Sequence, residues 1–162
     1  MSGTNNLYAD IGTVSLNHAG EQLCGDHVEI AGQDEAGSVI VLADGLGSGV
    51  KASILSTLTS TILSTMLASG LKLEDCVETI AATLPVCATR SIAYSTFTIL
   101  RLVNNERAEI IQYDNPRVIL LRDGKHLEFP CAELVVGGKK ILRSDVPLRQ
   151  GDVFLLMSDG VE

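Results

Sequence analysis

Residues 39–49 read Val39-Ile40-Val41-Leu42-Ala43-Asp44-Gly45-Leu46-Gly47-Ser48-Gly49, and this stretch decides the fold. A wholly apolar run is typical of a buried strand, and here it leads one carboxylate into a glycine-rich turn before a helical pattern. The arrangement recurs near the C-terminus as Val153-Phe154-Leu155-Leu156-Met157-Ser158-Asp159-Gly160. Aspartate is rarely buried unless it is paired or bound to a metal, so two such strands predict two carboxylates that converge on a cation.

The composition indicates one acidic globular domain that covers residues 1–162. The chain has 162 residues, of which 46% are hydrophobic, and this length suits a single domain. A formal net charge of -8 with only twelve Lys and Arg residues disfavours nucleic acid and anionic membrane surfaces as partners. The N-terminus has no signal-peptide pattern and no run reaches the ~18 apolar residues of a membrane span, so a cytoplasmic protein is expected.

The periodicity predicts strands, then two helices, then more strands. Apolar residues alternate loosely over 7–17 and more clearly over 26–31, and 37–44 forms a third strand. A period of 3.6 predicts a helix over 48–69, whose buried face would comprise Leu55, Leu63, Ile54, Leu58, Ile62 and Met66. A second helix is predicted over 73–84. Later strands are predicted over 94–103, 109–114, 117–122, 125–129, 139–142 and 153–158. Short turns between the later strands predict an α+β fold in which a sandwich of antiparallel sheets is covered by helices.

The glycine-rich turn after Asp44 has two interpretations. It superficially resembles the turn of dinucleotide-binding folds, but that fingerprint expects an acidic residue about 20 positions further on. No Asp or Glu occurs between Asp44 and Glu74. A site for a hard divalent cation explains the same residues better, because such ions prefer carboxylate and carbonyl oxygens, and Gly45 leaves its own carbonyl accessible.

Four residues are therefore the candidate metal ligands: Asp44, Gly45, Asp159 and Asp26. Asp26 lies beside a glycine at the start of a predicted strand, and its alternative interpretation is a plain turn residue. Asp114 is better explained by an Asp-Asn-Pro turn, and His27 by a surface position on a strand. The four cysteines show no zinc-like spacing and are expected to be free thiols.

Three segments together resemble the ordered motifs of the bacterial stage II sporulation protein E (SpoIIE) type of metal-dependent Ser/Thr phosphatase, within the protein phosphatase 2C-like superfamily. They are residues 42–49, residues 115–124 (Asn115-Pro116-Arg117-Val118-Ile119-Leu120-Leu121-Arg122-Asp123-Gly124) and residues 150–161, which include Ser158-Asp159-Gly160. Their order, spacing and strand context agree with the family over roughly residues 20–162.

The resemblance implies an α-β-β-α sandwich with a Mn²⁺ or Mg²⁺ centre at one end. It implies that Asp44 and Asp159 are the catalytic carboxylates, that the Gly45 carbonyl is a ligand, and that Asp26 lies near the ions. The implied reaction is hydrolysis of phosphoserine or phosphothreonine on a phosphoprotein, such as an anti-anti-sigma-type regulator, in partner-switching or stress and sporulation signalling. It also allows a regulatory role for the two predicted helices within residues 48–84, and a dimer formed through them.

Two functions remain open from the sequence. The acidic residues favour an enzyme, a Mn- or Mg-dependent protein-serine/threonine phosphatase. The family has a further metal carboxylate on a later strand, whereas the sequence stops at Glu162. A C-terminally incomplete domain is therefore expected. The family binds two ions, and this chain would bind fewer if the later carboxylate is needed as a ligand. The alternative is a pseudophosphatase or truncated module that binds a phosphoprotein without catalysis.

Overall fold

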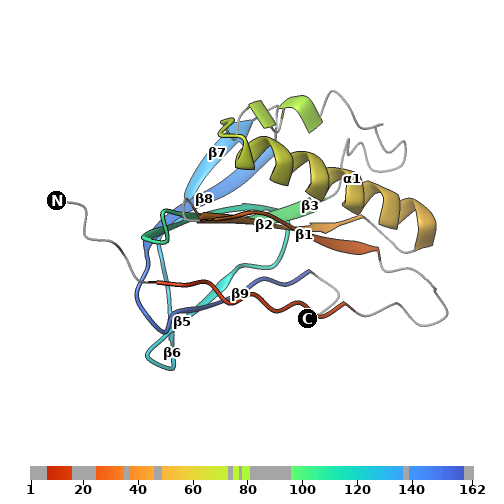
Figure 1. Cartoon of the computed structure of the whole chain (residues 1–162). Helices are drawn as coiled ribbons and strands as arrows, with labels where there is room; N and C mark the ends of the chain where they lie inside the picture. The colour runs from red at the N-terminus through yellow and green to blue at the C-terminus, as the bar shows by residue number, and fades with distance from the viewer. Residues whose placement is uncertain are drawn as a thin grey trace.

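The computed structural model describes residues 7–15, 25–34, 37–45, 49–72, 75–76, 78–80, 96–136 and 139–158. These residues form three layers: a long helix, a large sheet beneath it and a small sheet beneath that (Figure 1). The predicted sandwich of antiparallel sheets with a helical cover is confirmed.

All strand pairs are antiparallel, as the short connections predicted. The large sheet has the order β1-β2-β3-β4-β8-β7 and the small sheet has the order β6-β5-β9. The strands are β1 (Asp26–Asp34), β2 (Gly37–Asp44), β3 (Thr96–Val103), β4 (Arg107–Tyr113), β5 (Ile119–Arg122), β6 (Lys125–Leu127), β7 (Ala132–Val136), β8 (Lys139–Pro147) and β9 (Val153–Leu155).

The decisive apolar run is β2, and every residue of β2 is buried. Some other expectations were wrong. Residues 7–15 form no strand, although Ala9 and Ile11 pack against the core between the sheets. The final strand is short and lies at the edge of the small sheet, so Val153 and Leu155 are exposed rather than buried. The strand β7 was missed, because Ala132–Val136 lacks a clear alternation of apolar and polar residues.

The large sheet separates two apolar cores. The core beneath the helix includes Val41, Leu63, Phe97, Ile99 and Ile111. The core between the sheets includes Ile40, Leu100, Ile110, Val118 and Leu120. A central strand with both faces covered favours apolar residues on both faces, and this explains why β2 shows a continuous apolar run rather than an alternation.

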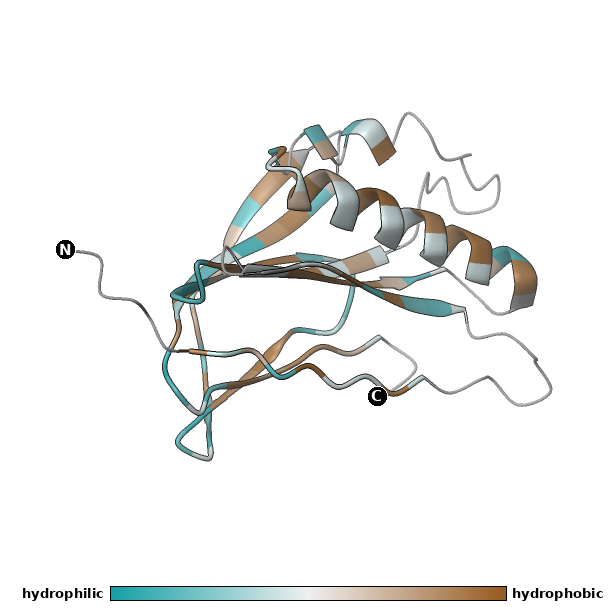
Figure 2. Cartoon of the chain, viewed as in Figure 1, coloured by the Kyte–Doolittle hydropathy of each residue, from teal (hydrophilic) through white to brown (hydrophobic). Residues whose placement is uncertain are grey.

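The helix α1 (Gly49–Ala68) has the predicted position, and its predicted buried face is confirmed in part: Leu63 is buried, and Ile62 and Met66 pack against the core. Ile54 and Leu58 were expected to be buried, and they are exposed. The residues buried against the sheet are mostly small: Ala52, Ser56, Thr59, Ser60, Leu63, Ser64 and Leu67. Figure 2 shows apolar and polar bands alternating along α1. Small side chains at this contact are compatible with a close approach of the helix, which is seen directly where the turn at Gly45 meets the Ala52 backbone.

The buried serines of α1 satisfy their own hydroxyl groups. Ser56, Ser60 and Ser64 each donate to the carbonyl oxygen three residues earlier, at 3.1, 3.1 and 3.2 Å. Hydrogen bonds of this kind remove the cost of burying a hydroxyl group without a partner. A polar side chain on this helix can therefore be buried. The sequence-based assignment placed only apolar residues on the buried face, and this is why it missed the serines.

Two further sequence expectations concern helices. Of the helix predicted over 73–84, residues 75–76 and 78–80 are described and helical, and Ile80 is buried as expected; the rest lies outside the described residues.

By length and composition α1 could cross a membrane, contrary to the expectation that no segment could. That expectation counted only apolar side chains, whereas α1 includes many Ser and Thr residues. In the structure α1 lies on the large sheet as a core helix.

Arg122, at the end of β5, joins the turn before β9 to the end of β8. Arg122 donates from Nε and a terminal nitrogen to the two carboxylate oxygens of Asp152, both at 2.8 Å, and also to the carbonyl of Pro147 at 2.8 Å. The Asp152 side chain is only 4% exposed. Hydrogen bonding to Arg122 lowers the pKa of Asp152 from its ordinary value of 3.8. A lowered pKa in the folded state means that the ionised carboxylate stabilises the fold.

We expect Asp152→Asn to lower the free energy of unfolding by about 1–3 kcal/mol at pH 7. Because the pKa is lowered on folding, this loss should stay constant above the unfolded-state pKa and shrink as the pH falls below it. Urea denaturation at a series of pH values measures the effect. The matched control is Glu133→Gln, which breaks the exposed 3.9 Å pair with Lys140 and should cost less than about 1 kcal/mol. Equal losses in both variants would contradict the proposed role of this pair.

Candidate metal centre

Asp26 and Asp44 lie directly opposite each other where β1 begins and β2 ends. The Gly45 amide donates to the Gly25 carbonyl at 2.9 Å, which holds the two turns together beyond the last strand pair. Because side chains alternate along a strand, Asp44 lies on the same face as Ile40, and Asp26 on the same face as Val28. Both of these apolar residues pack in the core between the sheets. The two carboxylates therefore face the space between the sheets at one end of the sandwich.

A contact across 132 residues of sequence brings the end of the small sheet to this point. The Ser158 hydroxyl donates to Oδ2 of Asp26 at 2.6 Å, and Ser158 is buried. Asp159, a predicted ligand, lies outside the described residues, so its position in the site stays a prediction. Its immediate neighbour Ser158 is in hydrogen-bond contact with Asp26.

Gly45 is held between the carboxylates and the helix. A Cβ atom built on Gly45 would lie 1.8 Å from the carbonyl oxygen of Ala52, in the first turn of α1. Main-chain atoms cannot swing aside as a flexible side chain can, so only glycine fits here. The turn after Asp44 therefore packs directly on the helix backbone, and Asp44 itself is only 7% exposed.

A polar network that the sequence did not predict continues the site along the same face of the large sheet. Thr96 lies opposite Asp44 at the start of β3, and its hydroxyl donates to Oδ1 of Asn115 at 2.9 Å. The Asn115 amide in turn donates to the Thr98 hydroxyl at 3.1 Å. The sequence feature that could have indicated this network is Asn115-Pro116, because the side-chain amide of an Asn in a turn can bond to a neighbouring strand.

Gln112 extends this network. Its Oε1 accepts from the Val118 amide at 2.8 Å, while its Nε2 has no hydrogen-bond partner among the described residues. Gln112 also lines a cavity of about 510 Å³ at the same end of the large sheet, together with Tyr113, Asp114, Asn115, Arg117, Glu133, Lys140 and Leu142. Asn115 in this lining is hydrogen-bonded to Thr96, which lies opposite Asp44, so the cavity is linked to the predicted carboxylates through β3, although neither carboxylate lines it.

Two residues that the sequence analysis set aside lie away from the carboxylates. His27 follows Asp26 on β1 and so points to the opposite face, where its Nε2 lies 3.0 Å from Oε2 of Glu29. Asp114 is exposed in a turn with a φ of 54°, a conformation that Asp tolerates.

The oxygen donors of the candidate site suit a divalent cation. Carboxylates at Asp26 and Asp44 and a carbonyl at Gly45 are the hard oxygen ligands that Mg²⁺ and Mn²⁺ prefer. Among the described residues, no group of three His, Cys, Asp or Glu side chains could hold a metal ion. The described residues thus supply two carboxylates of a site, and Asp159 would be the third.

Comparison with known proteins gives a family match. The sequence model of a family described as Stage II sporulation protein E (SpoIIE) matches residues 34–162. A search of curated proteins finds no match.

Solved structures give the fold. The PP2C phosphatase domain of the cell fate determinant SpoIIE from Bacillus subtilis, with a fragment of its regulatory domain, has a TM-score of 0.75 at 20% identity, over 91% of this chain and 45% of that one. RsbX in complex with magnesium has a TM-score of 0.69 at 23% identity, over 92% and 73% of the two chains. The RsbU and RsbW domains of Rv1364c from Mycobacterium tuberculosis have a TM-score of 0.68 at 17% identity, over 89% and 42%.

Proposed function

The chain belongs to the SpoIIE family and has its PP2C-like phosphatase fold, and from this premise we propose that it is a metal-dependent phosphatase of phosphoserine and phosphothreonine in proteins. The observation that carries the proposal is the direct pairing of Asp26 with Asp44 in the space between the two sheets. Adjacent carboxylates of like charge favour a cation between them. The cavity lined by Asn115, which is hydrogen-bonded to Thr96 opposite Asp44, would receive the substrate.

In this proposal Asp44, Asp26, Asp159 and the Gly45 carbonyl hold Mn²⁺ or Mg²⁺. The ions would supply Lewis-acid stabilisation of the phosphoryl oxygens and lower the pKa of an attacking water. The magnesium complex of the similar RsbX fold supports the choice of a hard cation.

The chain's own residues hold the carboxylates in place. The position of Asp44 is set by the buried strand β2 before it and by the close packing of Gly45 on α1 after it. The Ser158 hydroxyl orients Asp26, because a hydrogen bond at 2.6 Å leaves the carboxylate little freedom to rotate. A rigid arrangement of this kind lowers the reorganisation needed during reaction.

A phosphoprotein of a bacterial partner-switching pathway is the substrate that we propose, such as an anti-anti-sigma-type regulator, and the cytoplasm is the proposed location. The similar structure that contains RsbU and RsbW domains supports this class of partner. The cavity beside Asn115 would receive the chain on either side of the phosphorylated residue.

A second function is a module that binds a phosphoprotein without hydrolysing it. It is the alternative because the described residues supply two carboxylates, Asp26 and Asp44, while the third ligand, Asp159, stays a prediction. The two functions differ in turnover, since both allow binding of the phosphoprotein.

The test is hydrolysis of a phosphoserine peptide and of p-nitrophenyl phosphate by the full chain, with Mn²⁺, with Mg²⁺ and after chelation. The proposal expects turnover that requires Mn²⁺ or Mg²⁺ and metal binding that calorimetry detects. Turnover that resists chelation would overturn the metal mechanism. Metal and phosphopeptide binding without turnover would support the binding module instead.

A further inference from the structure

A second cavity lies on the other face of the large sheet, at the C-terminal end of α1. Its volume is about 260 Å³, and it is lined by Leu67, Gly70, Leu71, Lys72, Arg101, Glu109, Ile111 and Arg143. Arg101 pairs with Val39, whereas Thr96 pairs with Asp44, so the cavity lies five residues along β3, or about 17 Å, from the carboxylate pair. It is therefore separate from the candidate metal centre.

The cavity is basic although the chain is acidic. Three cationic side chains line it, and each comes from a different element: Lys72 follows α1, Arg101 lies on β3 and Arg143 on β8. Glu109 on β4 is the one carboxylate in the lining, which leaves two positive charges in excess. The chain as a whole carries a net charge of -8.

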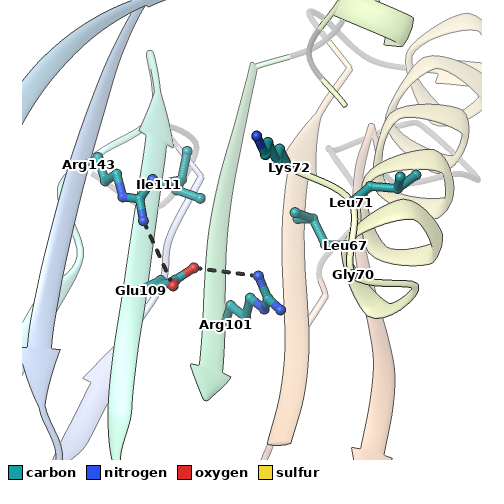
Figure 3. Close-up of a pocket in the computed structure, with 8 residues that line it drawn as sticks. All are labelled: Leu67, Gly70, Leu71, Lys72, Arg101, Glu109, Ile111 and Arg143. Carbon is teal, nitrogen blue, oxygen red and sulfur yellow. Dashed lines mark ion pairs between the residues drawn. The ribbon is translucent and has the colours of Figure 1, made fainter. Parts of the chain in front are cut away.

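Figure 3 shows Glu109 between Arg101 and Arg143, with an ion pair to each. These two distances, 3.7 and 3.8 Å, are too long for hydrogen bonds. The hydrogen bond to Glu109 comes from Arg107 instead, at 3.1 Å. Arg101 and Arg143 thus help to balance the charge of Glu109 while they retain N–H donors for another acceptor.

Lys72 belongs to none of the ion pairs recorded for the described residues. It follows Gly70, whose φ of 87° lets the chain turn back at the end of α1. That turn places Lys72 over the strands of the large sheet, on the face that carries Arg101 (Figure 3). A lysine held near two arginines is opposed by like-charge repulsion, which an anion would relieve.

We propose that this cavity binds a phosphate-type dianion through Lys72, Arg101 and Arg143. The two excess positive charges match a dianion, and guanidinium groups favour oxyanions with several acceptor atoms. The volume admits a compact anion but is small for a drug-sized ligand. A bound dianion would join the end of α1 to β3 and β8, and so would stabilise the packing of the helix on the sheet.

The experiment uses the metal-free full chain, so that the candidate metal centre contributes no phosphate affinity. Calorimetry and thermal unfolding are measured with inorganic phosphate and with chloride at equal ionic strength. Phosphate should bind and raise the unfolding temperature beyond chloride. Equal effects of the two salts would overturn the proposal, because they would show only general screening.

Lys72→Gln and Arg143→Gln should each weaken phosphate binding about tenfold, the loss expected for one charge-assisted hydrogen bond. The matched control, Lys125→Gln, removes an exposed cation in the small sheet and should leave the affinity unchanged. Arg143 also pairs with Glu109 and Asp145, so its replacement could destabilise the fold. In that case Lys72→Gln alone tests whether phosphate binds in this cavity. Unchanged affinity in Lys72→Gln would refute the site.

Two further arms separate this site from the proposed catalytic one. Lys72→Gln should leave the affinity for Mn²⁺ unchanged, and a loss of Mn²⁺ affinity would show that the substitution acts on the candidate metal centre instead. A phosphoserine peptide is compared with free phosphate. Tighter binding of the peptide would identify a phosphorylated protein segment as the source of the dianion, and tighter binding of phosphate would identify the free ion; either result supports the site.

Discussion

Asp44→Asn is expected to lower Mn²⁺-dependent hydrolysis of a phosphoserine peptide by about a thousandfold or more, because replacing a buried ligand charge removes several kcal/mol of stabilisation. The fold should survive. Two carboxylates directly opposite each other on neighbouring strands repel by about 0.2–1 kcal/mol, so without metal the variant should be as stable as the parent chain or slightly more stable. Initial rates measure the hydrolysis, calorimetric titration measures the affinity for Mn²⁺, and urea denaturation measures the stability.

Asp123→Asn is the matched control for this variant. It makes the same chemical change at an exposed hairpin position, where a φ of 54° suits Asn as well as Asp. Its activity and its affinity for Mn²⁺ should equal those of the parent chain. A folded Asp44→Asn variant that retains hydrolysis would show that Asp44 does not hold the cation.

Gly45→Ala is expected to lower the free energy of unfolding by about 3 kcal/mol or more, the upper range for overpacking. The added Cβ would lie 1.8 Å from the Ala52 carbonyl oxygen, so either the turn or the first part of α1 must move. Moving the turn displaces Asp44 from Asp26, and Mn²⁺ affinity should fall as well. Chemical denaturation and calorimetry measure the two effects.

Gly12→Ala is the control for added volume, since no atom lies within 4 Å of a Cβ built at Gly12. It should change stability by less than about 0.5 kcal/mol. A Gly45→Ala variant as stable as Gly12→Ala would mean that the close packing of the turn on the helix is not needed.

The candidate site was partly predictable from the sequence. Asp44 and Gly45 were predicted because an apolar strand that ends in Asp-Gly is unusual, and the structure places Asp26 opposite Asp44. Thr96, Asn115 and Ser158 were missed. Each acts through a partner far away in the sequence, as in the 2.6 Å contact of Ser158 with Asp26, and no local pattern reports such a contact.

The helix after the metal turn shows a second limit of sequence reasoning. Hydrophobicity assigned Ile54 and Leu58 to the buried face, whereas the structure buries Ser56, Ser60 and Ala52. Periodicity measures where apolar residues recur, but it contains no information about how closely a helix and a sheet approach. The close contact of Gly45 with the Ala52 backbone is one such approach, and it appears only in the folded structure.

By itself the sequence determined the strand 37–44, the helix that follows it and the antiparallel α+β class, because strand and helix periods and turn residues act over short stretches of chain. Only the tertiary structure decided which face of α1 is buried, that Asp26 lies opposite Asp44, and that Ser158 reaches Asp26 from the other sheet. These features depend on strand register and on the spacing between layers, which arise when distant segments pack together.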